Sequence, residues 1–176
     1  WHEQQIYPSS LPNASRHILV SSATSSGIPI CTSVFEYIKV KIIFEKEKLD
    51  AVNICLPHYL HSKVACYAFE KGINVLTEKP MDINLQSAEY AVEKAKASGV
   101  LFGVVSQCRY NNSAQLVKKA VVSGKLGKII SARSTLTWTR PDEYYGESDW
   151  KGTWDKEGGG VVIDQAIHSI DLVHWI

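Results

Sequence analysis

The chain lacks the features that mark several broad classes of protein. Its 176 residues carry a net charge of only +1, and no basic run alternates with aromatic residues. This composition predicts neither a nucleic acid nor an anionic membrane surface as a partner. No apolar run approaches the roughly 18 residues that span a bilayer. Residues 1–5 show neither the basic group nor the apolar core of a signal peptide, so we expect a cytoplasmic protein.

Cysteine is also scarce, with four residues and no Cys-x-x-Cys spacing. The pattern excludes the disulfide framework of a small secreted domain and predicts reduced, buried thiols. A thiol-dependent redox enzyme that uses Cys55 or Cys66 is a remote alternative, because no resolving partner accompanies either residue.

The composition is otherwise that of a folded domain, with 45% hydrophobic residues. Residues 1–26 are rich in serine, proline and asparagine and predict an irregular segment, in which only Ile18–Val20 could form a short strand. Residues 35–48 are amphipathic, and within them Lys39–Phe44 alternates in the manner of a strand.

A regular pattern begins at residue 51. Apolar runs ended by proline or glycine alternate with segments of helical periodicity, and the connections are short. This order predicts an α/β fold with a parallel sheet and covering helices. The predicted strands are 51–56, 74–77, 100–105 and a longer one at 129–139, and the predicted helices are 61–71, 84–97 and 113–122.

Polar residues follow three successive predicted strands. Pro57 and His58 follow the first, Glu78–Pro80 the second, and Gln107–Arg109 the third. The carboxyl ends of parallel strands share one edge, where ligands of such sheets bind. We therefore expect the three clusters to converge. Proline also keeps Lys79 out of the helical region, which suits a lysine that extends over a ligand.

A glycine-opened helix follows at Gly158–Asp171. Residues four apart stack on a helix, so Asp164 is expected to accept a hydrogen bond from His168 and to orient its ring for acid–base chemistry. A buried histidine with a purely structural role is the alternative, and Asp171 is expected to fix packing. Metal binding on this helix, or zinc binding by His58 and His61, lacks enough ligands at metal spacing.

Together these motifs resemble the glucose-fructose oxidoreductase / inositol dehydrogenase family (Gfo/Idh/MocA oxidoreductases). The resemblance extends from about Gly27 to the last residue. It rests on the motifs Leu56–His61, Glu78–Met81, Gln107–Tyr110, Trp150–Gly152 and Gly158–Asp171.

The resemblance implies an enzyme that oxidises a secondary alcohol of a sugar or polyol by hydride transfer to NAD or NADP. Its fold would be a partial Rossmann-type domain at 27–112, followed by the start of an α/β substrate domain at 113–176. Full-length relatives would be homo-oligomers. The implied catalytic residues are Lys79, Asp164 and His168, and the implied cofactor-binding residues are Pro57, His58, His61, Glu78, Lys79 and Arg109.

The amino-terminal part departs from the family pattern. No G-x-G-x-x-G motif, the turn that presents helix N–H groups to a pyrophosphate, occurs in the chain. An irregular segment is therefore expected in place of the first βαβ unit. The alternative function is a non-catalytic fragment or relic that acts, if at all, by association with a partner.

Overall fold

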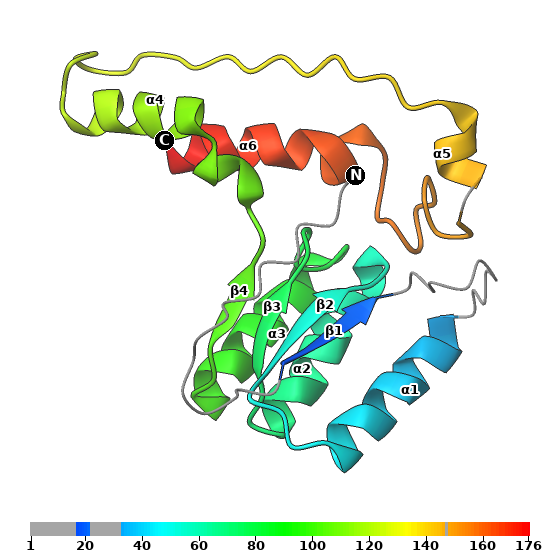
Figure 1. Ribbon diagram of the computed structural model, residues 1–176. Coiled ribbons are helices and arrows are strands. Elements are labelled where there is room, and N and C mark those ends of the chain that lie inside the picture. The colour runs from blue at the N-terminus through cyan, green and yellow to red at the C-terminus, as the bar shows by residue number, and fades with distance from the viewer. Residues whose placement is uncertain (1–16, 22–32, 147) are drawn as a thin grey trace.

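The computed structural model describes residues 17–21, 33–146 and 148–176. Four parallel strands form one sheet in the order β1-β2-β3-β4. Helices follow the strands, and a second group of helices lies beyond the sheet (Figure 1). The strands are β1 (His17–Ser21), β2 (Ala51–Cys55), β3 (Asn74–Thr77) and β4 (Phe102–Val104). The α/β class predicted from the sequence is confirmed.

The helices divide between the two parts of the chain. Those of the sheet domain are α1 (Ser33–Lys46), η1 (His58–Leu60), α2 (His61–Glu70), α3 (Leu85–Ser98) and η2 (Gln107–Tyr110). Those beyond the sheet are α4 (Asn112–Val122), α5 (Asp142–Gly146), η3 (Val162–Ala166), a π-helical turn, and α6 (Ile167–Trp175).

The core lies between the sheet and the helices α1, α2 and α3. Val52 and Ile54 of β2 and Val75 of β3 are buried on the face that these helices cover, whereas Asn53 is exposed. This alternation is that of a strand with one buried face. Apolar residues of α2 and α3 complete the core at helical spacing: Val64, Ala65, Ala68, Phe69, Ala91 and Ala95.

Local signals set the ends of α3 where the sequence predicted them. The side chain of Asn84 accepts a hydrogen bond from the backbone N–H of Ser87 at 3.2 Å and caps the helix. Gly99 ends it in the left-handed conformation, with φ of 71°, and donates its N–H to Ala95.

The strand-like alternation of Lys39–Phe44 was a wrong prediction, since these residues lie in α1. Val40 and Phe44 are both 3% exposed, whereas Ile42 is 44% exposed. A strand would place all three on one face, but a helix places only residues four apart together. The Phe44 ring stacks on Tyr67 of α2 at 6.0 Å between centroids.

The segment predicted as irregular also needs correction. β1 lies within residues 1–26 and pairs with β2, so that β1, α1 and β2 form a βαβ unit. The possible strand at Ile18–Val20 is thereby confirmed, whereas the expectation that the first βαβ unit is replaced was wrong. The other residues of segment 1–26 lie outside the described residues.

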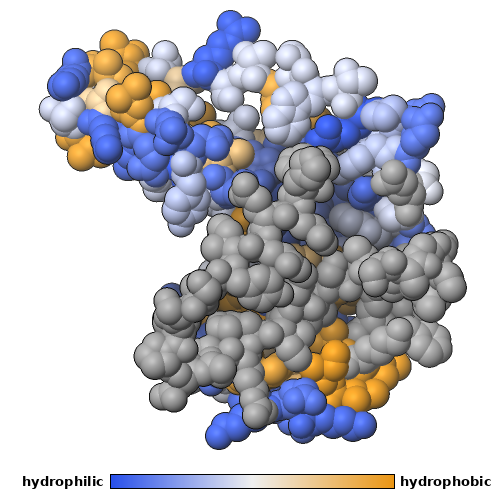
Figure 2. All heavy atoms as spheres, in the orientation of Figure 1, coloured by the Kyte–Doolittle hydropathy of each residue, from blue (hydrophilic) through white to orange (hydrophobic). Residues whose placement is uncertain are grey.

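The predicted strand at 129–139 is absent as a paired strand. This segment runs extended above α4 and α6, and no strand of the described residues lies beside it (Figure 1). A strand is stabilised by hydrogen bonds to a neighbouring strand. The apolar alternation of residues 129–139 is therefore not enough by itself to make this segment part of a sheet. Ile130 is 93% exposed, and apolar side chains also gather at the end of α4 and the turn after it (Figure 2).

Among the residues that the structure describes, no helix has both the length and the apolar character needed to cross a bilayer.

Gly158 allows the loop before η3 to pack against the connection between β3 and α3. Its φ is 94°, and a Cβ atom there would lie 2.6 Å from the Ile83 side chain. We expect Gly158→Ala to lower the free energy of unfolding by roughly 1–3 kcal/mol, because it combines backbone strain with a clash.

Gly160→Ala is the matched control, since a Cβ atom there meets no atom within 4 Å and the φ angle is not positive. Urea denaturation of both variants measures the difference. Equal losses of stability would contradict the packing role of Gly158.

Candidate functional site

The carboxyl ends of β2, β3 and β4 meet at one edge, as the sequence predicted. β3 pairs in parallel with both β2 and β4. His58 and Lys79 line one cavity at this edge, and Lys79 and Arg109 line a smaller one next to it. The predicted convergence of the three polar clusters is confirmed.

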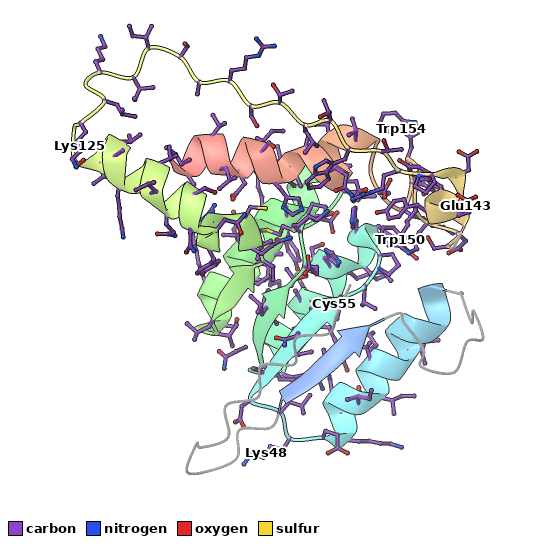
Figure 3. The ribbon with its side chains drawn as sticks, turned by 45° about the horizontal axis from the view of Figure 1, so that its top comes forward. Lys48, Cys55, Lys125, Glu143, Trp150 and Trp154 are labelled. Carbon is purple, nitrogen blue, oxygen red and sulfur yellow. The ribbon has the colours of Figure 1, made fainter. Side chains whose placement is uncertain are left out.

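The larger of these two cavities, which we call the edge cavity, has a volume of about 530 Å³. Its walls come from the sheet edge, α6 with η3, and the segments that cover the edge. Side chains from these elements crowd the space between the sheet and α6, with Cys55 and Trp150 labelled in Figure 3. The residues that line it include His58, Glu78, Lys79, Trp138, Arg140, Tyr144, Trp150, Asp164, Gln165 and His168.

Lys79 and Asp164 form an ion pair that joins the end of β3 to η3. The Lys79 ammonium donates to the backbone carbonyl of Asp164, and its Nζ lies 3.3 Å from Asp164 Oδ1. The two side chains are 16% and 9% exposed. Burial tends to raise the pKa of Asp164, but hydrogen bonds from Gln165 and the charge of Lys79 lower it overall. Asp164 is therefore ionised at neutral pH.

The expected hydrogen bond between Asp164 and His168 is not formed. The Asp164 carboxylate instead accepts from Lys79 on Oδ1, and from Gln165 and Tyr144 on Oδ2. Asp164 lies in the π-helical turn, whose hydrogen bonds span five residues. Because that turn is wider than an α-helical turn, residues four apart no longer stack across it.

His168 lies in the first turn of α6 and lines both cavities at the sheet edge. Burial lowers the pKa of its imidazole, and the positive charge of Lys79 lowers it further, whereas nearby carboxylates partly oppose these effects. A neutral ring at neutral pH is the form that accepts a proton.

His58 is 4% exposed and is held on two sides. Its Nδ1 lies 2.9 Å from the backbone carbonyl of Glu157, and its ring makes an edge contact with Trp150. A carbonyl only accepts, so Nδ1 carries the hydrogen and Nε2 is the acceptor of the neutral ring. Burial lowers the pKa of His58 to about 4, although the bond to Glu157 opposes the shift.

His61, also an expected cofactor ligand, is completely buried. Its two ring nitrogens lie 2.7 Å and 2.6 Å from the carbonyl oxygens of Leu56 and Pro80. The ring therefore connects the end of β2 with the turn that follows Lys79, and neither nitrogen is left for a ligand.

The remaining expected cofactor residues are placed differently. Pro57 lies directly before η1 and lines neither cavity at the edge. Glu78 lines the edge cavity and accepts from the backbone N–H of Lys79 at 3.2 Å. Arg109 directs its guanidinium to the carboxylate of Asp171, with Nε at 2.8 Å. This bond ties η2 to α6, in agreement with the packing role expected for Asp171.

Several residues of the edge cavity were not identified from the sequence. Arg140 and Tyr144 come from a segment with no motif of its own, and Gln165 lies inside one but carries no distinctive spacing. Glu157 lines an adjoining cavity of about 340 Å³ and not the edge cavity itself. It is 1% exposed and accepts from the backbone N–H of Gly152 at 2.8 Å, and burial raises its pKa. Its position directly before three glycines is the one signal that could have drawn attention to it.

Thiol and metal chemistry find little support among the described residues. Cys55, Cys66 and Cys108 are all free. Burial raises the pKa of Cys55 and of Cys66, which keeps both as unreactive thiols. Within the described ranges, no group of three or more histidine, cysteine or acidic side chains is arranged to hold a metal ion.

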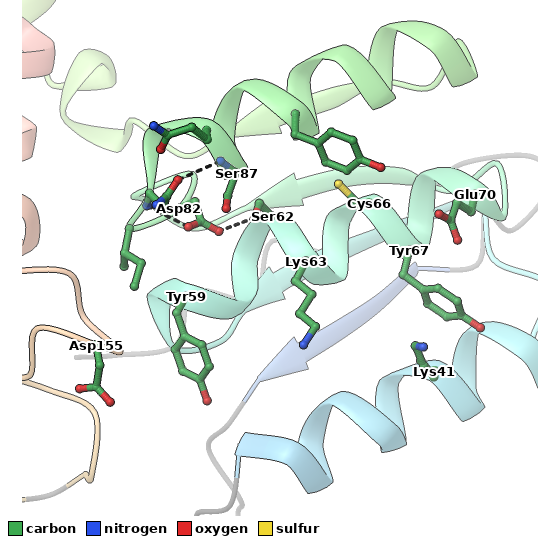
Figure 4. Close-up of a pocket in the computed structure, with 14 residues that line it drawn as sticks. Lys41, Tyr59, Ser62, Lys63, Cys66, Tyr67, Glu70, Asp82, Ser87 and Asp155 are labelled. Atoms are coloured by element: carbon green, nitrogen blue, oxygen red, sulfur yellow. Dashed lines mark hydrogen bonds between the residues drawn. The ribbon is translucent and has the colours of Figure 1, made fainter.

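A larger groove of about 870 Å³ lies among α1, α2 and α3 (Figure 4). It shares no lining residue with the edge cavity. Some of its polar groups pair with each other, since Ser62 donates to Asp82 and the N–H of Ser87 donates to Asn84. Size alone therefore does not identify it as the functional site.

A parallel sheet with a mixed polar and apolar cavity at its carboxyl edge is the arrangement of a nucleotide-binding α/β protein. Comparison with models of protein families identifies the family. Residues 7–106 match the model described as "Oxidoreductase family, NAD-binding Rossmann fold", and residues 114–176 match "GFO/IDH/MocA C-terminal domain". The chain belongs to the GFO/IDH/MocA oxidoreductase family.

Curated relatives and solved structures agree with this assignment. The chain is 28% identical over 139 residues to scyllo-inositol 2-dehydrogenase (NAD(+)) of Bacillus subtilis, with 76% of this chain and 37% of that protein covered. It is 28% identical over 128 residues to 1,5-anhydro-D-fructose reductase of Ensifer adhaerens, with 73% and 38% covered.

The structure resembles the WlbA dehydrogenase from Bordetella pertussis, solved in complex with NADH and UDP-GlcNAcA. The TM-score is 0.74 at 35% identity, over 76% of this chain and 38% of that chain. The chain thus spans a little more than a third of the length of the relatives it matches.

The pKa of His58 predicts how stability depends on pH. The unfolded chain protonates this histidine near pH 6.5, but the folded chain does so only near pH 4. As the pH falls between these values, the unfolded state takes up a proton that the folded state does not. We expect this to lower the free energy of unfolding by up to about 3 kcal/mol.

His58→Asn keeps an N–H that can donate to Glu157 but removes the titrating ring, so its stability should depend less on pH between 6.5 and 4. Urea denaturation of both chains across this range measures the difference. Identical pH dependence would show that His58 is not the titrating group.

Proposed function

We propose that the chain is part of an NAD(P)-dependent oxidoreductase of the sugar or cyclitol dehydrogenase type. The observation that carries the proposal is the meeting of Lys79, Asp164 and His168 around the edge cavity. A lysine side chain paired with a carboxylate, next to a neutral imidazole, is the set of groups that alcohol oxidation needs. The substrate we propose is a small polyol or sugar, as in the relatives named above.

The cavity suits the nicotinamide end of a dinucleotide. It lies at the carboxyl edge of a parallel sheet, and it combines apolar walls such as Leu56 and Trp150 with polar side chains such as His58. A bound nicotinamide would supply the acceptor for a hydride. We take NAD as the cofactor, because a relative and a neighbouring structure are named with NAD(+) and NADH.

The residues of the chain would manage the proton. His168 accepts the hydroxyl proton of the substrate, since its low pKa keeps the ring neutral. Lys79 donates a hydrogen bond to the same oxygen and lowers the cost of its developing negative charge. Asp164 holds the Lys79 ammonium in place.

We also propose a division into a nucleotide-binding part and the start of a substrate domain at about residue 112, a cytoplasmic location, and a homo-oligomer for the complete protein. The second candidate function is a fragment that binds no cofactor. It is favoured by the sequence that follows β1, where residues 22–32 contain a single glycine.

Substitutions of His168 and Lys79 test the proton path in a full-length family member that carries the same residues. His168→Ala should lower turnover roughly 10²–10⁴-fold, the usual contribution of a general base. Lys79→Ala should also lower turnover, with a much smaller effect on the dissociation constant of the cofactor. The equivalent of His174→Ala is the matched control, because His174 is exposed on the same helix. Near-normal turnover of a folded His168→Ala variant would contradict the assignment.

Cofactor titration tests whether the isolated chain can hold a dinucleotide without a glycine-rich turn. A glycine-rich turn supplies several N–H bonds to the pyrophosphate, each worth roughly 1.5–3 kcal/mol. Without it, we expect no tight binding of NAD(H) or NADP(H) by the isolated chain. Calorimetry measures this, with a family member that has the glycine-rich turn as the control. Micromolar binding would show that another segment holds the phosphates.

A further inference from the structure

Asp164 and Lys79 are held by a hydrogen-bonded network whose other members have no assigned role. The network begins at Arg140, passes through the side-chain amide of Gln165, and ends at the Asp164–Lys79 pair. Gln165 is 9% exposed and Asp164 is 7% exposed, so most of the network is removed from water.

The amide of Gln165 has one favourable orientation. Its Nε2 donates to Asp164 Oδ2 at 2.7 Å, and its Oε1 accepts from Arg140 Nη2 at 3.1 Å. A guanidinium only donates and an ionised carboxylate only accepts. Rotation of the amide by 180° would place oxygen against oxygen and N–H against N–H, so the two neighbours together fix the amide.

The segment that carries Arg140 is itself anchored next to this network. The Arg140 guanidinium lies 5.4 Å from the Trp138 ring centroid and 5.0 Å from that of Tyr144. The Tyr144 hydroxyl donates to Asp164 Oδ2 at 3.3 Å. Arg140 and Gln165 also line both the edge cavity and a separate cavity of about 340 Å³. They therefore form part of the wall between these two cavities.

We propose that Gln165 is a positioning residue, which fixes the Asp164 carboxylate in the orientation that binds Lys79, and that Arg140 fixes Gln165. The consequence for turnover rests on the proposed function. With Oδ2 held by Gln165 and Tyr144, Oδ1 is directed to the Lys79 ammonium. Lys79 then stands in one place at the edge cavity, rather than following a carboxylate that is free to rotate.

The first test is the titration of the Asp164 carboxyl group, followed by ¹³C NMR on the 176-residue chain. Gln165→Leu should raise its pKa, because a donor to the charged form is lost. Gln165→Glu should raise it further, because two carboxylates at this separation share a proton. The matched control is Gln86→Glu, at an exposed position. The same Asp164 titration midpoint in all four chains would overturn the proposal.

Hydrogen exchange of the wild-type chain keeps the test independent of variants that fail to fold. The side-chain amide protons of Gln165 should exchange with D₂O far more slowly than those of exposed Gln86. Equally fast exchange of the two amides would overturn the proposal as well.

Turnover supplies a readout that a merely structural role would not move. In the full-length family member that carries the same residues, Gln165→Leu should lower kcat roughly 10- to 100-fold with little change in KM, the usual effect of losing a bond to a charged group. For Gln165→Glu, the activity relative to wild type should recover as the pH falls, since the protonated side chain donates again.

The readouts separate this proposal from the proposed function. If the Asp164 titration responds but His168→Ala leaves turnover of the full-length family member unchanged, the proposed proton path fails and the positioning role stands. If His168→Ala lowers that turnover but Gln165→Leu matches wild type in both turnover and titration, the positioning role fails and the proposed function stands.

Discussion

The Lys79–Asp164 ion pair is the interaction on which the candidate site depends, because it joins the edge of the sheet to the helices beyond it. Both side chains are largely buried, and removing one partner of such a pair leaves a charge without compensation, at a cost of about 3–5 kcal/mol. The surrounding contacts support this junction from both sides. His61 fixes the turn after Lys79, and Gln165 fixes the carboxylate of Asp164.

Burial gives the titratable groups of the site different protonation states within a small volume. His58 and His168 are neutral at neutral pH, whereas Asp164 stays ionised because it accepts hydrogen bonds and faces Lys79. Glu157 has few compensating contacts, and burial raises its pKa. Different surroundings can shift pKa values apart in this way, so that residues of the same type differ in protonation state at one pH.

The amino-terminal part shows that a fold and its usual ligand contacts can separate. β1, α1 and β2 form a parallel βαβ unit, and the match to the NAD-binding family begins at residue 7. The sequence between β1 and α1 nevertheless lacks the glycine motif that normally contacts a pyrophosphate. Strand pairing needs apolar side chains and backbone hydrogen bonds, and these survive changes that a phosphate-binding turn does not tolerate.

The sequence alone determined the elements with strong local signals. Asn84 and Gly99 marked the ends of α3, and the short apolar runs gave β2 and β3. The order of these elements was enough to bring His58, Lys79 and Arg109 to one edge, because parallel strands present their carboxyl ends together.

Only the tertiary structure decided the rest. α1 is a helix because Val40 and Phe44 pack together on the core, and residues 129–139 stay unpaired because no described strand lies beside them. In the π-helical turn, the Asp164 carboxylate binds Lys79 and not His168, although the four-residue spacing in the sequence suggested a bond to His168. Local spacing predicts which residues are neighbours on a regular helix, but buried polar groups bind the partners that packing brings to them.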